Sequence, residues 1–198
     1  MKDNCSVLVH TFNRYQKYWD GFIHGYNKHV KFDIPKYFGT DTTFHGEHNF
    51  TGWNVIYSGD MEWSNRLVKL LQQIPTEYVW YQQEDMHPCA APPDMAELMK
   101  IVIEKDIYRL QISPVIQFYS LTGSKIPLYF HWKSKYLVSH QPSIWKKSFL
   151  LECLQPNEDP WKNEYEGTKR LNREEFAGKI AIYPYDWFTH ESPKVANN

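Results

Sequence analysis

The sequence predicts an α/β domain in which a mixed, mostly parallel central sheet is flanked by helices. Short hydrophobic runs alternate with segments of helical periodicity over roughly the first 110 residues, a pattern typical of parallel βαβ units. No linker rich in proline or glycine divides the 198 residues, and 42% of them are hydrophobic, enough for a sizeable core. We therefore expect one domain over residues 1–198.

The first half contains most of the expected βαβ elements. Its predicted strands end in polar residues, and its second helix is bounded by a candidate cap, Asp60, and by Pro75. The expected strands are residues 5–9, 34–38, 53–57, 78–81 and 107–112. The expected helices are residues 15–26, 63–74 and 95–103.

The second half is less regular. Residues 115–119 and 126–132 flank a turn-like stretch at 121–125 and predict a hairpin or a pair of extended segments. Asp159 followed by Pro160 resembles an N-cap with proline at the first helical position, which predicts a short helix after it. The remaining expected elements are a strand at 136–139, helices at 145–154 and 161–169, and a strand at 180–183.

Composition limits the classes of partner. The formal net charge is −1, which favours neither a nucleic acid nor an anionic membrane. No apolar run approaches the roughly 18 residues of a membrane span, and the opening MKDNCSVLVH lacks a signal-peptide pattern, so we expect a soluble, cytoplasmic protein. Three widely spaced cysteines indicate a reducing compartment. The polar tail at 192–198 is also compatible with a fragment of a longer protein.

The stretch YVWYQQEDMHP runs a hydrophobic strand directly into Glu84 and Asp85. Ligands of parallel sheets bind at the carboxyl ends of strands, so carboxylates placed there can meet a cation or a substrate. Side chains alternate along a strand, which puts Gln83 and Asp85 on one side and Glu84 on the other. This geometry suits Mg²⁺, Mn²⁺ or a ribose better than a facing acid/base pair. Alternatively, the two acids only solvate a turn before Pro88.

Six stretches occur in order along nearly the whole chain: FNRYQKYWDGF, GDMEWSNRLVKLLQQI, EYVWYQQEDM, YRLQI, SHQPSIWKKSFLLECL and NEDPWKNEYEG. Together they resemble a small family of GT-A-type glycosyltransferases found among bacterial surface-polysaccharide enzymes and proteins of large algal viruses. The resemblance implies a GT-A-like (Rossmann-like) fold. It also implies a nucleotide-sugar-binding half over about residues 1–112 and an acceptor-binding half over about residues 113–198.

The activity that the resemblance implies is metal-dependent transfer of a hexosyl or deoxyhexosyl group from a nucleotide-diphosphate donor, with a UDP-sugar favoured, to a glycan hydroxyl. The cofactor would be Mn²⁺ or Mg²⁺ at a DXD-like site, for which this chain has Gln83-Glu84-Asp85. Asp85 is the expected metal ligand and catalytic carboxylate. Glu84 would contact the metal through water or bind the ribose, and His190 would complete the site. The glutamine at 83 should weaken metal affinity.

The resemblance also assigns the donor pocket. Four side chains follow the first strand and could hold the base and ribose: Thr11, Asn13, Arg14 and Tyr15. Asp41, after the second strand, could accept from uracil or ribose, and Arg66 could reach the donor because guanidinium matches phosphate oxygens. The alternatives are an ordinary polar loop, a turn cap at Asp41 and a surface salt bridge at Arg66.

The acceptor side falls in the second half. The resemblance places four acceptor-binding residues there: Gln141, Ser143, Trp145 and Trp161. Inverting transfer needs a carboxylate that takes the proton of the acceptor hydroxyl, and Glu164 is the expected base, with Glu158 and Asp159 in reserve. A buried helix tryptophan at 145 and a solvated helix acid at 164 are the alternatives.

Two other function classes remain open. The many Trp and Tyr residues also suit a non-catalytic carbohydrate-binding module, although such modules are usually β-sandwiches. A sugar-nucleotide nucleotidyltransferase would commonly carry a glycine-rich phosphate loop near the first strand, and FNRYQKYW has none. The sequence predicts a nucleotide sugar and a glycan as partners, no nucleic acid, and no particular oligomeric state.

Overall fold

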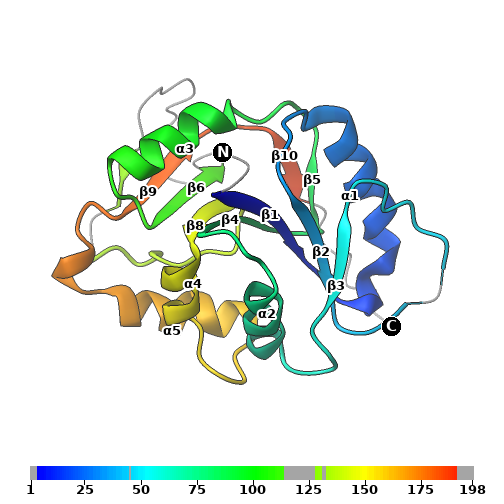
Figure 1. Ribbon diagram of the computed structural model, residues 1–198. Helices are drawn as coiled ribbons and strands as arrows, with labels where there is room; N and C mark the ends of the chain where they lie inside the picture. The colour runs from blue at the N-terminus through cyan, green and yellow to red at the C-terminus, as the bar shows by residue number, and fades with distance from the viewer. Residues whose placement is uncertain (1–3, 45, 114–127, 131–132, 191–198) are drawn as a thin grey trace.

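The computed structural model describes residues 4–44, 46–113, 128–130 and 133–190, and its centre is an eight-stranded sheet with the order β3-β2-β1-β4-β8-β6-β9-β7 (Figure 1). Strand β8 runs antiparallel to β4 and β6, β7 runs antiparallel to β9, and the other neighbours are parallel. The predicted mixed, mostly parallel sheet is thus confirmed. The strands are β1 (Cys5–His10), β2 (Lys36–Thr40), β3 (Asn54–Tyr57), β4 (Tyr78–Gln83), β6 (Arg109–Ser113), β7 (Leu128–Tyr129), β8 (Ser143–Lys146) and β9 (Ile180–Pro184).

Helices cover both faces of the sheet. Figure 1 shows α1 and α3 on one face and α2, α4 and α5 on the other. The helices are α1 (Gln16–His29), α2 (Trp63–Gln72), α3 (Met95–Glu104), α4 (Lys147–Cys153) and α5 (Pro160–Leu171), with 3-10 turns at Asn13–Tyr15 and Glu174–Phe176. This arrangement gives the three layers expected of a parallel sheet that is buried on both faces.

Alternation along β1 explains how one strand serves two cores. All six of its residues are buried, as expected for a central parallel strand. Val7 and Val9 belong to the core under α1 and α3, whereas Leu8 belongs to the core under α2, α4 and α5. By the same alternation the next side chain, His10, points toward the α2 face.

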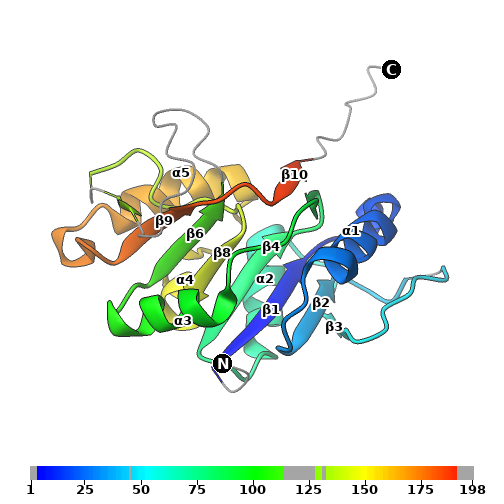
Figure 2. The same cartoon turned by 90° about the horizontal axis from the view of Figure 1, so that it is seen from above.

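A second, two-stranded sheet was not predicted. Strand β5 (Met86–Pro88) pairs antiparallel with β10 (Phe188–His190), and the pairing places His190 opposite Met86. Helix α1 packs tightly on this pair, because a Cβ at Gly25 would lie 2.7 Å from the Pro88 carbonyl oxygen. Figure 2 shows β10 beside the end of β4. The small sheet therefore brings the end of the described chain to the carboxylates that follow β4.

Several sequence predictions are corrected by the structure. Residues 136–139 form no strand; the strand of this region, β8, begins at Ser143 and includes Trp145, which had been expected in a helix. Helix α2 has Glu62 at its N-cap position rather than Asp60. Asp159 does cap α5, with Pro160 at the helix start. The predicted segments 115–119 and 121–125, and most of 126–132, lie outside the described residues.

The state of the cysteines and the character of the helices can also be read from the structure. All three cysteines are free thiols, with Cys5 and Cys153 buried and Cys89 exposed. Among the helices in the described ranges, none has the length and apolar character that a membrane crossing requires.

Candidate functional site

The strand order reverses direction at β1. Strands β2 and β3 follow each other on one side of β1, and β4 lies on its other side. In open α/β sheets, ligands bind outside the carboxyl ends of the strands at such a switch point. The residues directly after β1, β2 and β4 are therefore the first place to look for a site.

The polar residues after β1 and β2 form one network. Asp41 is 6% exposed, and its Oδ1 accepts from the backbone N–H of Asn13 at 2.8 Å and from the Thr40 hydroxyl at 2.9 Å. The Thr40 hydroxyl also lies 2.7 Å from Asn13 Oδ1, and Asn13 Nδ2 donates to Thr42 Oγ1 at 2.9 Å. The structure thus brings together two predicted donor-binding residues, Asn13 and Asp41, that are far apart in the sequence.

Cations and aromatic rings surround this network. The Arg14 guanidinium lies 4.7 Å from the centre of the Phe12 ring and 4.9 Å from that of Tyr15. The Arg66 guanidinium lies 4.3 Å from the Phe12 ring, and its Nη1 donates to the Met61 carbonyl at 2.8 Å. Phe12 is thus a shared contact of two predicted site arginines, although sequence reasoning did not single it out. Its only sequence signal was its place between Thr11 and Asn13.

Glu84 is buried at the end of β4, with 6% of its surface exposed. Burial raises its pKa to about 8, and Asp85 adds to the rise, while hydrogen bonding from Thr11 opposes it. The Thr11 hydroxyl in turn accepts from Trp19 Nε1 at 2.8 Å. Thr11 therefore links Glu84 to Trp19 through two hydrogen bonds. A carboxyl group with such a raised pKa is a candidate functional group, because a bound cation would favour its charged form.

Asp85 lies next to His190, and these are two of the residues expected to hold a metal. His190 Nε2 lies 3.0 Å from Asp85 Oδ2, a contact created by the pairing of β5 with β10. The other oxygen, Oδ1, is buried without a hydrogen-bond partner among the described residues. Burial raises the pKa of Asp85, and His190 opposes that rise. An unpaired buried carboxylate oxygen beside an imidazole is a pair of donor atoms suited to a divalent cation.

The described residues contain no group of three or more His, Cys, Asp or Glu side chains placed to hold a metal ion. A cation here would thus have two side-chain ligands, Asp85 and His190, and would depend on phosphate oxygens and water for the rest. Mg²⁺ and similar ions are commonly held in this way, by one or two protein ligands together with substrate phosphates. The residues present therefore fit a cation that binds together with a diphosphate.

The predicted acceptor residues separate into two groups. Ser143 and Trp145 are 0% exposed: the serine hydroxyl donates to the Gln141 carbonyl, and the Trp145 ring packs 5.0 Å from the buried Arg109 guanidinium. Neither side chain is available to touch an acceptor, which corrects that expectation. Gln141 is half-buried and Trp161 is 77% exposed, so both can reach a ligand.

Glu164 lies on α5, where its Oε1 accepts from the backbone N–H of His140 at 2.7 Å. It also faces the sheet: Tyr81, on β4, has its pKa raised chiefly by burial and further by Glu84, Asp85 and Glu164. The phenol of Tyr81 thus lies within electrostatic reach of the carboxylates predicted for the metal and of the predicted base. The predicted base and the carboxylates predicted for the metal thus all act electrostatically on the same tyrosine of β4.

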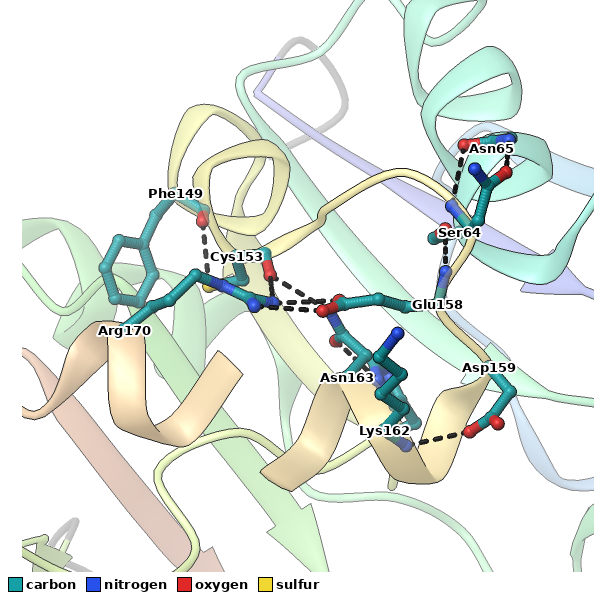
Figure 3. Close-up of polar contacts among 11 residues, drawn as sticks. Ser64, Asn65, Phe149, Cys153, Glu158, Asp159, Lys162, Asn163 and Arg170 are labelled. Carbon is teal, nitrogen blue, oxygen red and sulfur yellow. Dashed lines mark hydrogen bonds and ion pairs between the residues drawn. The ribbon is translucent and has the colours of Figure 1, made fainter. Parts of the chain in front are cut away.

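Glu158 is ruled out as a base by its partners, which Figure 3 shows. Arg170 donates from Nη1 and Nη2 to its two carboxylate oxygens at 2.9 and 2.8 Å, and Asn163 donates to Oε2 at 2.7 Å. Burial works to raise the pKa of Glu158, but these hydrogen bonds outweigh it and lower the pKa. The neighbouring Asp159 is exposed and accepts from the backbone N–H of Lys162 at 2.8 Å.

Sequence reasoning also missed a buried arginine. Arg109 is 0% exposed, and burial lowers its pKa to about 10. Since guanidinium can only donate, its bond to Gln111 Oε1 makes the Gln111 amide N–H₂ donate to Gln141 Oε1 at 3.2 Å. The amide nitrogen of Gln141 is therefore turned away from Gln111. Nothing in the local sequence YRLQI distinguishes this arginine from a surface one.

Comparison with solved structures finds the same fold in S. aureus TarS. One TarS structure matches with a TM-score of 0.64 and 14% identity over 96% of this chain and 37% of that chain. TarS 1-349 in complex with UDP matches with a TM-score of 0.60 and 15% identity, over 93% and 59% of the two chains. Its complex with UDP-GlcNAc matches with a TM-score of 0.57 and 14% identity, over 98% and 61%.

This chain spans less than two thirds of the length of these TarS chains. No protein-family model matches the sequence, and no curated protein sequence matches it. At such low identity the likeness concerns the fold, and it confirms the predicted class: a GT-A-like α/β domain with a mostly parallel central sheet flanked by helices.

Proposed function

We propose that the chain is a glycosyltransferase domain that moves a sugar from a nucleotide-diphosphate donor, a UDP-sugar, to a hydroxyl of a glycan. One observation carries the proposal above the others. Two carboxyl groups with raised pKa values, the buried Glu84 and the half-buried Asp85, follow β4 at the switch point of the sheet, where the Asn13–Asp41 network follows β1 and β2. The likeness of the fold to TarS, solved with UDP and with UDP-GlcNAc, supports this choice of donor.

The donor would lie across the ends of β1, β2 and β4. Asp41 Oδ2 and Asn13 would take the base or ribose, while Arg14 and Tyr15 would close the pocket from the 3-10 turn. Arg66 would contact the phosphates, because its guanidinium is held in place by the Met61 carbonyl and the Phe12 ring. Thr11 acts indirectly, by holding Glu84.

Asp85 and His190 would hold Mn²⁺ or Mg²⁺, with Glu84 as a water-mediated ligand or a ribose contact. When bound, the cation supplies positive charge that stabilises the diphosphate leaving group. Asp85 contacts His190, but glutamine occupies the first position of the triplet, which supports a weaker metal requirement than a full D-x-D site would impose.

Glu164 would accept the proton of the acceptor hydroxyl, in an inverting transfer. It lies on the face of α5 that meets the sheet, and the backbone N–H of His140 fixes one carboxylate oxygen. Gln141 and Trp161 would contact the acceptor glycan, the first through its amide and the second by stacking on a sugar ring. Asp159 remains the reserve base, since the capping hydrogen bond from the Lys162 N–H uses Oδ1 and, among the described residues, leaves Oδ2 available.

The proposed function is tested by turnover with a panel of UDP-, GDP- and dTDP-sugars in the presence of Mn²⁺ or Mg²⁺. We expect consumption of a UDP-sugar, as hydrolysis or as transfer to an added glycan. If no nucleotide sugar bound while free glycans did, the chain would be a carbohydrate-binding module. Release of pyrophosphate from UTP and a sugar phosphate would instead identify a nucleotidyltransferase.

The identity of the base is tested separately with Glu164→Gln and Asp159→Asn. Asparagine keeps the capping ability of position 159, so both variants should fold. We expect Glu164→Gln to lose transfer and to keep UDP affinity. Loss of transfer in Asp159→Asn, with transfer retained in Glu164→Gln, would assign the base to Asp159.

A further inference from the structure

His10, the last residue of β1, is a buried histidine at the edge of the sheet where the proposed donor binds. It is 2% exposed, and its ring lies 5.5 Å from the Trp63 ring and 6.3 Å from the Tyr81 ring. Strand alternation directs it to the α2 face, beside Arg66. A polar ring enclosed in this way needs a reason, because burying an unpaired polar group is costly.

The hydrogen on the His10 ring can be assigned from its neighbours. Burial, followed by the charge of Arg66, lowers the pKa of His10 well below its ordinary value, so the ring is neutral and carries one N–H. The Tyr81 hydroxyl oxygen accepts from Gln83 Nε2 at 3.2 Å and lies 3.5 Å from His10 Nδ1. We assign the phenol hydrogen to Nδ1, and this assignment places the ring N–H at Nε2.

Two buried N–H groups on neighbouring elements have no hydrogen-bond partner within the described part of the chain: His10 Nε2 and Arg66 Nε. Arg66 donates to the Met61 carbonyl and lies against the ring of Phe12. Phe12 follows His10 by two residues in the sequence. The charges that act on Arg66 include Asp41 and Arg14, and Arg66 acts on Glu84. The two donors are therefore within electrostatic range of residues of the proposed donor pocket.

We propose that His10 Nε2 and Arg66 Nε together bind a phosphate oxygen of the nucleotide donor, which makes His10 a binding residue of this site. Guanidinium and imidazole N–H groups are donors that match an oxyanion, and hydrogen bonds to a charged oxygen are the strong ones. The inference rests on the proposed function, since it takes a nucleoside diphosphate as the ligand.

The test measures the affinity of uridine, UMP and UDP, with Mn²⁺ present, for the wild type, His10→Phe and His10→Gln. Phenylalanine keeps the ring and removes the N–H, so UDP affinity should fall about tenfold or more while uridine affinity stays unchanged. Glutamine keeps an N–H and should recover most of the loss. Ligand-observed NMR reports the weak uridine complex, and calorimetry reports UDP.

His140→Phe is the matched control. His140 is also buried, and its ring contacts the same Trp63 and Tyr81 rings, but its Nε2 is bonded to Asn163 Oδ1 at 2.9 Å. This variant should leave UDP affinity unchanged. If the wild type failed to bind UDP, the proposed function itself would fail. If the wild type bound UDP and His10→Phe bound it equally well, or lost uridine and UDP alike, only the role of His10 would be overturned.

Discussion

A glutamate is buried at the end of β4 and another just before α5, and the two environments shift the pKa of the glutamate in opposite directions. Glu158 is 3% exposed and receives hydrogen bonds from Arg170 and Asn163, which lower its pKa (Figure 3). Glu84 is 6% exposed, and the hydrogen bond from Thr11 does not offset its burial, so its pKa rises to about 8.

The difference distinguishes Glu158, which has a structural role, from Glu84, for which we propose a functional one. Glu158 ties the start of α5 to its last turn, and the backbone of residue 158 also bonds Ser64 at the start of α2. Arg170 already balances the negative charge of Glu158 in the folded protein. At the end of β4, Glu84 and the unpaired Oδ1 of Asp85 cost the free protein stability and gain from a ligand. Raised pKa values at the switch point of the sheet are thus the reason why we propose the site there.

The largest effect is expected for Asp85→Asn. Removing the charge that faces His190 should lower turnover of a UDP-sugar at least about a hundredfold, while the similar shape of asparagine leaves the fold intact. Steady-state kinetics with the sugar nucleotide measures it. Asp186→Asn, at an exposed carboxylate before β10, is the control and should keep wild-type turnover. Equal activity of the two variants would remove Asp85 from the site.

Next in size is Glu158→Gln, which should lower the free energy of unfolding by about 2–3 kcal/mol and leave UDP affinity unchanged. The buried ion pair loses its charge while Arg170, whose side chain is 28% exposed, keeps part of its solvation. Urea denaturation measures the loss. The control, Glu152→Gln, breaks an exposed pair with Arg173 and should cost less than about 1 kcal/mol. Comparable losses in the two variants would contradict the structural role.

A smaller effect, which depends on pH, is expected at Glu84. The pKa of Glu84 is raised, whereas that of Glu158 is lowered. Its raised pKa means that the folded state prefers the protonated acid. The stability it contributes is therefore fully present below its ordinary pKa of 4.5 and is lost as the pH rises through about 8. Between about pH 6 and pH 8 the ligand-free protein should lose about 2 kcal/mol from this group.

Glu84→Gln should remove that part of the pH dependence, because the amide does not titrate. Urea denaturation of the variant and the wild type at both pH values gives the difference. The same pH dependence in both proteins would show that Glu84 does not carry the raised pKa.

The smallest change is expected for Gln83→Asp, which places an acid at the first position of the D-x-D-like triplet. Its carboxylate should raise the affinity for Mn²⁺ in the presence of UDP by roughly tenfold. Calorimetry measures that affinity, and Gln83→Asn, which adds no charge, is the control. An unchanged Mn²⁺ affinity would show that the side chain at 83 points away from the cation, toward the Tyr81 hydroxyl that it now contacts.

Local pattern was enough to predict the elements of the first half. Hydrophobic periodicity predicted β1, α2 and β4 to within a few residues, because each of these elements depends on a short stretch of chain. The resemblance assigned Asn13, Asp41 and Asp85 to the site, and the structure places all three after strands of the sheet. Their roles stay predictions.

Long-range pairing explains what the sequence could not predict. Strand β8 inserts antiparallel between β4 and β6, which places Trp145 in the core rather than at an acceptor. The pairing of β5 with β10 joins residues about a hundred positions apart, and neither short strand has a distinctive pattern. His10 likewise reads as one more residue of a buried strand until its unpaired Nε2 is seen beside Arg66.

The most direct test of the account is a calorimetric titration of the wild-type protein with UDP, with and without Mn²⁺. We expect UDP to bind in the presence of Mn²⁺ and to bind much more weakly after chelation, because Asp85 and His190 hold the cation only together with phosphate oxygens. A chain that bound no UDP, even with Mn²⁺ and millimolar nucleotide, would contradict a donor site at the ends of β1, β2 and β4.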